Sequence, residues 1–111
     1  MNIQIYGKSK CFDTKKAQRY FKERGVRFQD IDLPRYGMSR GELMNVLKAT
    51  TGIDALLDPK HMDAALVRYL ASDEAKIEKL LEKPALIRTP VVRNGKQATI
   101  GYRPEIWKNW E

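Results

Sequence analysis

Alternating and periodic apolar positions in the first third of the chain predict a strand, a helix and a second strand. Apolar residues alternate with polar ones over residues 2–6 and again over 26–33, and they recur at helical spacing over 13–24. Gly25 is typical of the position just beyond a helix, and we expect Pro34 to end the second strand. This order is a βαβ unit, so the two strands should be parallel.

The central third of the chain predicts helices only. Ser39 and Glu42 have the spacing of a capping box at a helix start, and two further helices are expected near 61–71 and 73–83. The apolar residues of the helix near 61–71 are Leu66, Tyr69 and Leu70. We therefore expect residues 39–83 to form a helical insertion.

The C-terminal third predicts a β-hairpin followed by a helix. The apolar run at 89–92 is separated from the run at 97–100 by Asn94-Gly95, a strong hairpin signal. A last helix is expected at 104–110. The predicted fold class is therefore α/β, with βαβ and ββα halves around a mixed four-stranded sheet. We expect one domain over residues 1–111.

Composition and apolar patterning indicate the cellular location of the protein. One cysteine in 111 residues allows no internal disulfide. No apolar stretch approaches the roughly 20 residues that span a bilayer, and the first residues show no signal-peptide pattern. We therefore expect a cytoplasmic protein without membrane contact.

Cys11 is the strongest candidate for chemistry. It stands between the first predicted strand and the first predicted helix, and four lysines lie within five residues of it. Helix N-termini and nearby cations both favour the thiolate, which is the nucleophilic form. The alternative is a small buried hydrophobic residue.

The charge distribution could support an anion site near this cysteine. The net charge is +7, and residues 1–40 hold 10 Lys or Arg against 4 Asp or Glu. A basic surface would attract an oxyanion, the carboxylates of glutathione, an acidic protein patch or nucleic acid, although it could equally be ordinary solvated surface. No nucleic-acid motif accompanies the charge, so no direct nucleic-acid binding is expected. His61 and Cys11 alone cannot form a zinc site, so no metal is expected.

Four stretches of the chain carry a resemblance to a known family. They are residues 5–17 (IYGKSKCFDTKKA), 52–57 (GIDALL), 83–92 (KPALIRTPVV) and 100–107 (IGYRPEIW). In this order they resemble the arsenate reductase (ArsC) and Spx-like family of the thioredoxin-like fold. The resemblance implies that Cys11 is the catalytic nucleophile and that Pro90 is a cis-proline. The resemblance also implies that Arg88 and Arg103 bind an anion. The lysines beside Cys11 and the backbone amides at the helix start could bind the same anion. The expected anion-binding residues are therefore Lys8, Lys10, Phe12, Asp13, Arg88 and Arg103.

Three positions differ from the pattern of that family. Thr89 separates Arg88 from Pro90, Asp58 falls near the place of a further arginine, and Thr14 stands where Spx-type regulators often have a second cysteine. An acid at position 58 would repel arsenate. Without a second cysteine, an oxidised or adducted Cys11 must be resolved by an outside thiol.

The function that we expect is that of a monothiol redox protein similar to the glutaredoxin-dependent arsenate reductases. Cys11 would attack an oxyanion, a disulfide or a glutathione adduct. No bound cofactor is expected; glutathione or a similar small thiol would be the co-substrate, and a glutaredoxin could be the partner. The alternative is a Spx-like regulatory module that binds RNA polymerase or another protein without turnover.

Overall fold

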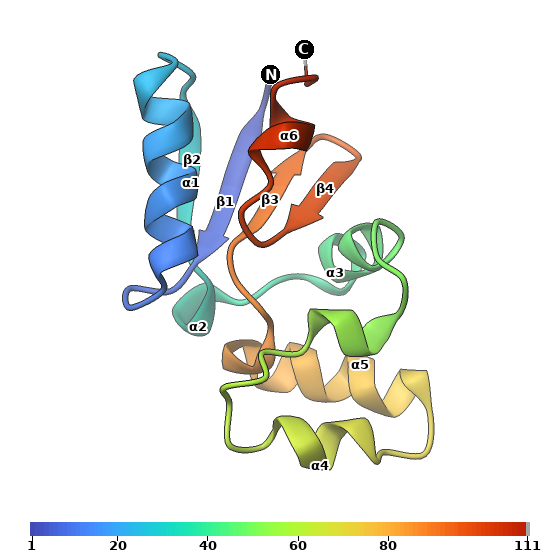
Figure 1. The fold of residues 1–111 in the computed structure, drawn as a ribbon. Helices are drawn as coiled ribbons and strands as arrows, with labels where there is room; N and C mark the ends of the chain where they lie inside the picture. Colours follow the sequence, from blue (N-terminus) through green and yellow to red (C-terminus); the bar gives the residue numbers. More distant parts are fainter. Residues whose placement is uncertain (111) are drawn as a thin grey trace.

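The computed structural model describes residues 1–110, which form a four-stranded sheet flanked by helices (Figure 1). The elements follow one another along the chain as β1 (Ile3–Gly7), α1 (Phe12–Glu23), β2 (Phe28–Asp32), α2 (Leu33–Tyr36), α3 (Arg40–Leu47), η1 (Ile53–Leu56), α4 (Ala64–Arg68), α5 (Asp73–Glu82), η2 (Pro84–Leu86), β3 (Val91–Asn94), β4 (Gln97–Ile100) and α6 (Pro104–Trp107).

The sheet has the order β2-β1-β3-β4 and is mixed. β1 pairs with β2 in parallel, as a βαβ unit requires, and it pairs with β3 antiparallel. β3 and β4 form the antiparallel hairpin. The predicted βαβ and ββα halves around a mixed four-stranded sheet are therefore confirmed, and β1 lies at their junction.

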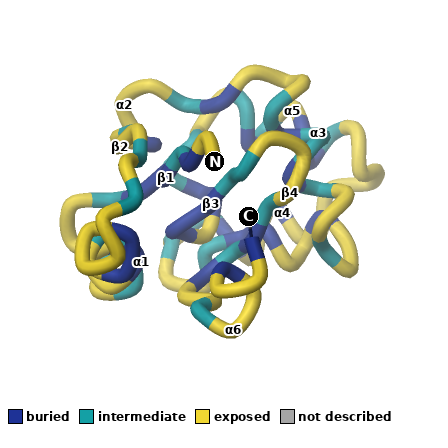
Figure 2. Tube along the Cα trace, turned by 90° about the horizontal axis from the view of Figure 1, so that it is seen from above, coloured by how far each residue is buried: buried dark blue, intermediate teal, exposed yellow. Residues whose placement is uncertain are grey.

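Each face of the sheet carries its own hydrophobic cluster. Ile3 and Ile5 of β1 pack with α1 and α6, where Trp107 lies 5.2 Å from the ring centroids of both Tyr20 and Phe21. On the other face, Tyr6 packs against the helices between β2 and β3. Successive side chains of a strand point to opposite faces, so β1 serves both clusters. Figure 2 shows β1 largely buried and the first half of β3 buried, near the centre of the molecule.

A polar network joins the central helices to the sheet. The Tyr6 hydroxyl donates to Glu42 at 2.9 Å, and Arg93 of β3 lies 3.4 Å from the same carboxylate and 3.0 Å from the Asn45 side-chain oxygen. Glu42 also completes the predicted capping box with Ser39. This network fixes α3 against the sheet.

One short helix was not expected, and one expected helix is shorter. β2 ends at Asp32, before Pro34, as expected, but the chain continues directly into the short helix α2, where Pro34 occupies the first turn and its missing N–H costs nothing. The helix expected at 61–71 contracts to α4, which buries Ala64 and Val67 and leaves Leu66 and Tyr69 exposed. Helical spacing does not reveal which face of a short helix meets the core.

The start of α1 approaches the end of β1 very closely. A Cβ atom added to Gly7 would lie 2.2 Å from Cγ2 of Thr14, a distance at which something must move. Thr14 is itself buried, and its hydroxyl accepts the Lys8 N–H at 3.5 Å. Only glycine at position 7 permits this approach, which sets the position of the loop between them.

Gly7→Ala should therefore destabilise the protein by about 1–3 kcal/mol, the usual cost of overpacking. Chemical denaturation monitored by circular dichroism measures this loss. Thr14→Ser removes the clashing methyl group, so the double variant should recover part of the loss. At Gly41 in α3, an added Cβ would meet only Ser39 Oγ, at the ordinary contact distance of 4.0 Å, so Gly41→Ala should instead leave stability unchanged or raise it by up to about 1 kcal/mol. Equal losses in Gly7→Ala and Gly41→Ala would refute the close approach.

Candidate functional site

Cys11 lies at the N-cap position of α1, half-buried and with a free thiol. A turn precedes it, in which its N–H donates to the Lys8 carbonyl at 3.2 Å. The Thr89 carbonyl lies 3.5 Å from the sulfur, and the peptide bond between Thr89 and Pro90 is cis. The thiol therefore faces the backbone just before β3, although 78 residues separate the two in sequence.

Hydrogen-bond donors around the sulfur determine its acidity. Partial burial alone would raise the pKa of Cys11, since it disfavours the charged form. The hydroxyls of Thr14 and Thr89 and the amides of Thr14 and Asp13 outweigh burial and lower that pKa. The Thr89 carbonyl favours the protonated thiol, but it is a single weak acceptor against several donors. The site therefore favours the thiolate.

A cleft of about 750 Å³ opens in front of the sulfur. We call it the Cys11 cleft, and its lining residues are Lys8, Lys10, Cys11, Phe12, Asp13, Asp58, Pro59, Lys60, Arg88 and Thr89. They come from the loop before α1 with the first residues of that helix, from the segment after η1 and from the segment before β3. An isolated bridge between Leu57 and Ile87 holds the last two segments together.

Lys8 is held by the protein and is not a free cation in this cleft. Its Nζ lies 2.7 Å from Asp58 Oδ2 and 2.7 Å from the Ala85 carbonyl. Burial raises the pKa of Asp58, but the hydrogen bonds from Lys8 and from the Lys60 N–H outweigh it and leave that pKa below its usual value. Asp58 is thus ionised at neutral pH, and its charge is neutralised by Lys8.

The cleft brings together most of the predicted anion-binding residues. Lys10, Phe12, Asp13 and Arg88 line it with Lys8, but Arg103 does not. The Arg103 Nε donates to the Ile100 carbonyl at 3.3 Å, and its side chain lines a neighbouring cavity of about 360 Å³. Arg88 lines both cavities. The structure thus places Arg103 beside Arg88 at a second cavity and not at the mouth of the Cys11 cleft.

Lys60 is a residue of the cleft that sequence reasoning missed. It follows Asp58 in a turn in which the Asp58 carboxylate accepts the Lys60 N–H at 2.9 Å. The available signal was Asp58-Pro59, which marks a turn, but nothing local shows that this turn faces Cys11. Its position depends on backbone bonds from Asp58 to Leu86 and from Arg88 to Leu56.

Within residues 1–110, no group of three or more His, Cys, Asp or Glu side chains is arranged to hold a metal ion. His61 instead accepts the Asp63 N–H at its Nδ1 atom, which stabilises a local turn. Over the same residues, no helix is long and apolar enough to cross a membrane.

A model of the ArsC family matches residues 6–110, nearly the whole chain. The chain belongs to the ArsC family. The match includes Cys11, the segment after η1 and the Thr89–Pro90 segment, so all three sides of the cleft lie within the family region.

This ArsC-family chain is similar in sequence to two regulators and similar in fold to a solved reductase structure. "Global transcriptional regulator Spx 2" of Oceanobacillus iheyensis is 27% identical over 129 residues, covering 100% of this chain and 94% of its own. "Regulatory protein MgsR" of Bacillus subtilis is 29% identical and covers 92% of this chain and 84% of its own. The solved arsenate reductase from Vibrio cholerae is 24% identical, with a TM-score of 0.83 and coverage of 96% and 94%. The predicted thioredoxin-like fold is confirmed.

The lowered pKa of Cys11 should be visible in the pH dependence of its alkylation. The rate should follow the thiolate fraction and reach half its plateau below the ordinary thiol value of about 8.5. Thr14→Val removes a donor to the thiolate, so its profile should shift to higher pH. Its rate near neutral pH should fall roughly three- to tenfold, since a hydrogen bond to a charged group contributes about 1.5–3 kcal/mol and a more basic thiolate is also a better nucleophile.

Thr51→Val is the matched control, because Thr51 is exposed and lies outside the cleft. Its alkylation profile should coincide with that of the unmodified protein. A profile for the unmodified protein that is centred at or above the ordinary thiol value would refute the stabilised thiolate. Thr14→Val and Thr51→Val profiles that coincide would refute the role of the Thr14 hydroxyl.

Proposed function

We propose that this ArsC-family protein is a monothiol oxidoreductase that acts on glutathione mixed disulfides. The observation that carries the proposal is a single cysteine with a lowered pKa, which faces a cleft without a second thiol and with cations that form no ion pair within residues 1–110. Such a thiol can complete half of a disulfide exchange and depends on another molecule for the other half.

The reaction balances with glutathione as the second thiol. The Cys11 thiolate attacks the glutathione sulfur of a mixed disulfide, a Cys11–glutathione disulfide forms, and the substrate leaves as its thiolate and takes up a proton. A second glutathione thiolate then attacks the glutathione sulfur bound to Cys11 and releases glutathione disulfide and the Cys11 thiolate. In total, the mixed disulfide and one glutathione become the free substrate thiol and glutathione disulfide. The substrate sulfur is reduced to a thiol and one free glutathione is oxidised, while the glutathionyl sulfur of the substrate remains in a disulfide throughout. A glutaredoxin could replace glutathione in the second step.

The positive charges in the cleft suit the binding of an anionic substrate group. Within residues 1–110, the side chains of Lys10, Lys60 and Arg88 form no ion pair. All three line the Cys11 cleft, where they could contact the carboxylates of glutathione. The Lys8–Asp58 pair adds no net charge. Because Lys8 is held by Asp58, it offers no free charge to a compact, doubly charged oxyanion, whereas an extended glutathionyl group can reach several of the other cations. Arsenate is therefore the weaker substrate in this proposal.

The second candidate is a regulatory module that binds a protein of the transcription machinery, with RNA polymerase as the partner. It is supported by the regulators among the relatives, which cover most of this chain. The side chains of Met62, Leu66 and Tyr69 at α4 are 69–88% exposed and could contact such a partner. In this candidate function, Cys11 senses the redox state and catalyses no reaction.

Turnover of a glutathionylated peptide in the presence of glutathione separates the two candidates. The unmodified protein should reduce it, Cys11→Ser should be inactive, and Arg88→Met should lower kcat/KM roughly three- to tenfold, as expected when one charged contact to the substrate is lost. Arg68→Met, which removes an exposed arginine of α4 outside the cleft, should retain full activity. Arsenate in the same assay should turn over more slowly.

Activity that survives in Cys11→Ser would refute the proposed chemistry. Absence of turnover with the mixed disulfide and with arsenate, with either glutathione or a glutaredoxin, would also refute it. If the immobilised protein then retained purified RNA polymerase, and Leu66→Glu abolished that retention, the regulatory candidate would take its place.

A further inference from the structure

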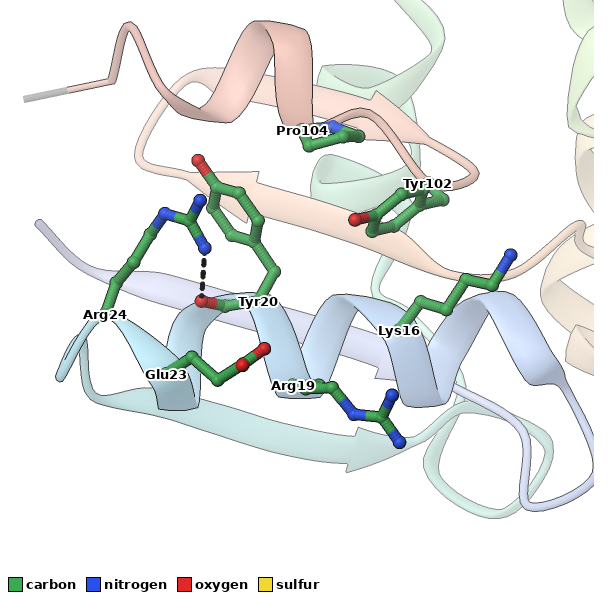
Figure 3. A pocket seen from close by; sticks show the side chains of 7 residues that line it. All are labelled: Lys16, Arg19, Tyr20, Glu23, Arg24, Tyr102 and Pro104. Atoms are coloured by element: carbon green, nitrogen blue, oxygen red, sulfur yellow. Dashed lines mark hydrogen bonds between the residues drawn. The ribbon is translucent and has the colours of Figure 1, made fainter.

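A third cavity lies along α1, on a part of the surface that the Cys11 site does not use. It has a volume of about 780 Å³ and runs between the C-terminal two-thirds of α1 and the segment that leads from β4 into α6 (Figure 3). We call it the α1 groove; the lining residues that matter here are Lys16, Arg19, Tyr20, Glu23, Arg24 and Tyr102. It shares no lining residue with the Cys11 cleft.

The α1 groove is basic. Lys16, Arg19 and Arg24 contribute three positive charges to its lining and Glu23 one negative charge. Within residues 1–110, Arg19 forms no ion pair, and Lys16 reaches only Asp13, at 4.0 Å and with both side chains exposed. Such a contact contributes little. These charges are therefore available to a ligand from outside the chain.

Two of these cations are held in place by the tyrosines of the groove. The Arg24 guanidinium carbon lies 3.6 Å from the centroid of the Tyr20 ring, and its Nη1 donates to the Tyr20 carbonyl at 3.2 Å. Lys16 Nζ lies 5.6 Å from the centroid of the Tyr102 ring. Figure 3 shows Arg24 folded back over Tyr20. Because the cations are already positioned, binding costs less side-chain entropy than it would for free side chains.

The same stacking selects the kind of ligand. A nucleic-acid base would need an open aromatic face, but Arg24 covers one face of Tyr20 and Lys16 lies over Tyr102. Both rings also pack edge-on against Trp107, with centroids 5.2 and 5.6 Å away. What the groove offers is N–H donors and positive charge around a fixed aromatic floor. Carboxylates suit such donors, and guanidinium groups bind them especially well.

We propose that the α1 groove docks an acidic segment of a partner protein, with Arg19 and Arg24 as the main contacts to its carboxylates. Glu23 opposes this binding and limits its strength. The proposal does not depend on the chemistry of Cys11, since the two cavities have no lining residue in common. A partner bound here could keep the Cys11 cleft accessible to a second molecule.

The test is a titration of the ¹⁵N-labelled full chain with a capped decapeptide of alternating glutamate and serine, followed by amide chemical shifts. The shifts should concentrate on residues 16–24 and at Tyr102, and should weaken as salt is added. The double variant R19Q/R24Q should weaken binding about tenfold, whereas E23Q should strengthen it, as expected for charge complementarity in a binding site.

The matched control is K22Q/R27Q, which removes the same charge from exposed residues outside the groove. It should change the dissociation constant less than about twofold, since charges at the rim or beyond act mainly through the general field. Equal weakening by both double variants, shifts centred on the Cys11 cleft, or no saturable shifts would each overturn the proposal. So would tighter binding of a thymidine decanucleotide at the same residues, which would assign the groove to nucleic acid. Circular dichroism checks that each variant is folded.

Discussion

The close packing of Thr14 on Gly7 determines where the rest of the site can be. It brings the first turn of α1 down onto the end of β1, so that the loop between them closes in a single turn at Cys11. β1 is a central strand bonded to both β2 and β3. The start of α1 therefore lies against the most buried part of the sheet. Because Cys11 is the N-cap residue of α1, its thiol lies there too.

The same packing connects the fold to the chemistry. Thr14 is buried and lies against Gly7, and its hydroxyl and amide are among the groups that lower the pKa of Cys11. From the other side, the pairing of β1 with β3 brings Thr89 to the sulfur. Burial and donors act on the thiol in opposite directions, and the donors prevail. A half-buried cysteine can thus be held in place by packing and still ionise easily. Both properties favour a nucleophile, because the thiolate is the reactive form.

The elements that sequence reasoning predicted correctly are those whose signals are local. The alternation in β1, the glycine after α1, the capping box of Ser39 and Glu42 and the Asn94-Gly95 hairpin each involve neighbouring residues. The helical part was predicted less well, because the short helix α4 exposes Leu66 and Tyr69 and its inner face depends on distant packing.

In the candidate site, too, the features with local sequence signals were predictable and those that depend on distant contacts were not. The position of Cys11 at a helix start is a local property and was predicted. The Lys8–Asp58 pair spans 50 residues, and the inclusion of Lys60 depends on the bridge between Leu57 and Ile87. No local pattern encodes such contacts. The placement of Arg103 outside the cleft likewise follows from its bond to the Ile100 carbonyl, which only the three-dimensional arrangement reveals.

Cys11 performs the first half of a disulfide exchange, and a thiol from another molecule must complete the second half. Intact mass spectrometry of the protein after incubation with glutathione disulfide near neutral pH tests it most directly. We predict one glutathione adduct, absent in Cys11→Ser, that forms faster than on an unstructured cysteine peptide. The adduct should persist after the disulfide is removed and disappear when reduced glutathione is added. An adduct that forms no faster than on the peptide, or none at all, would contradict it.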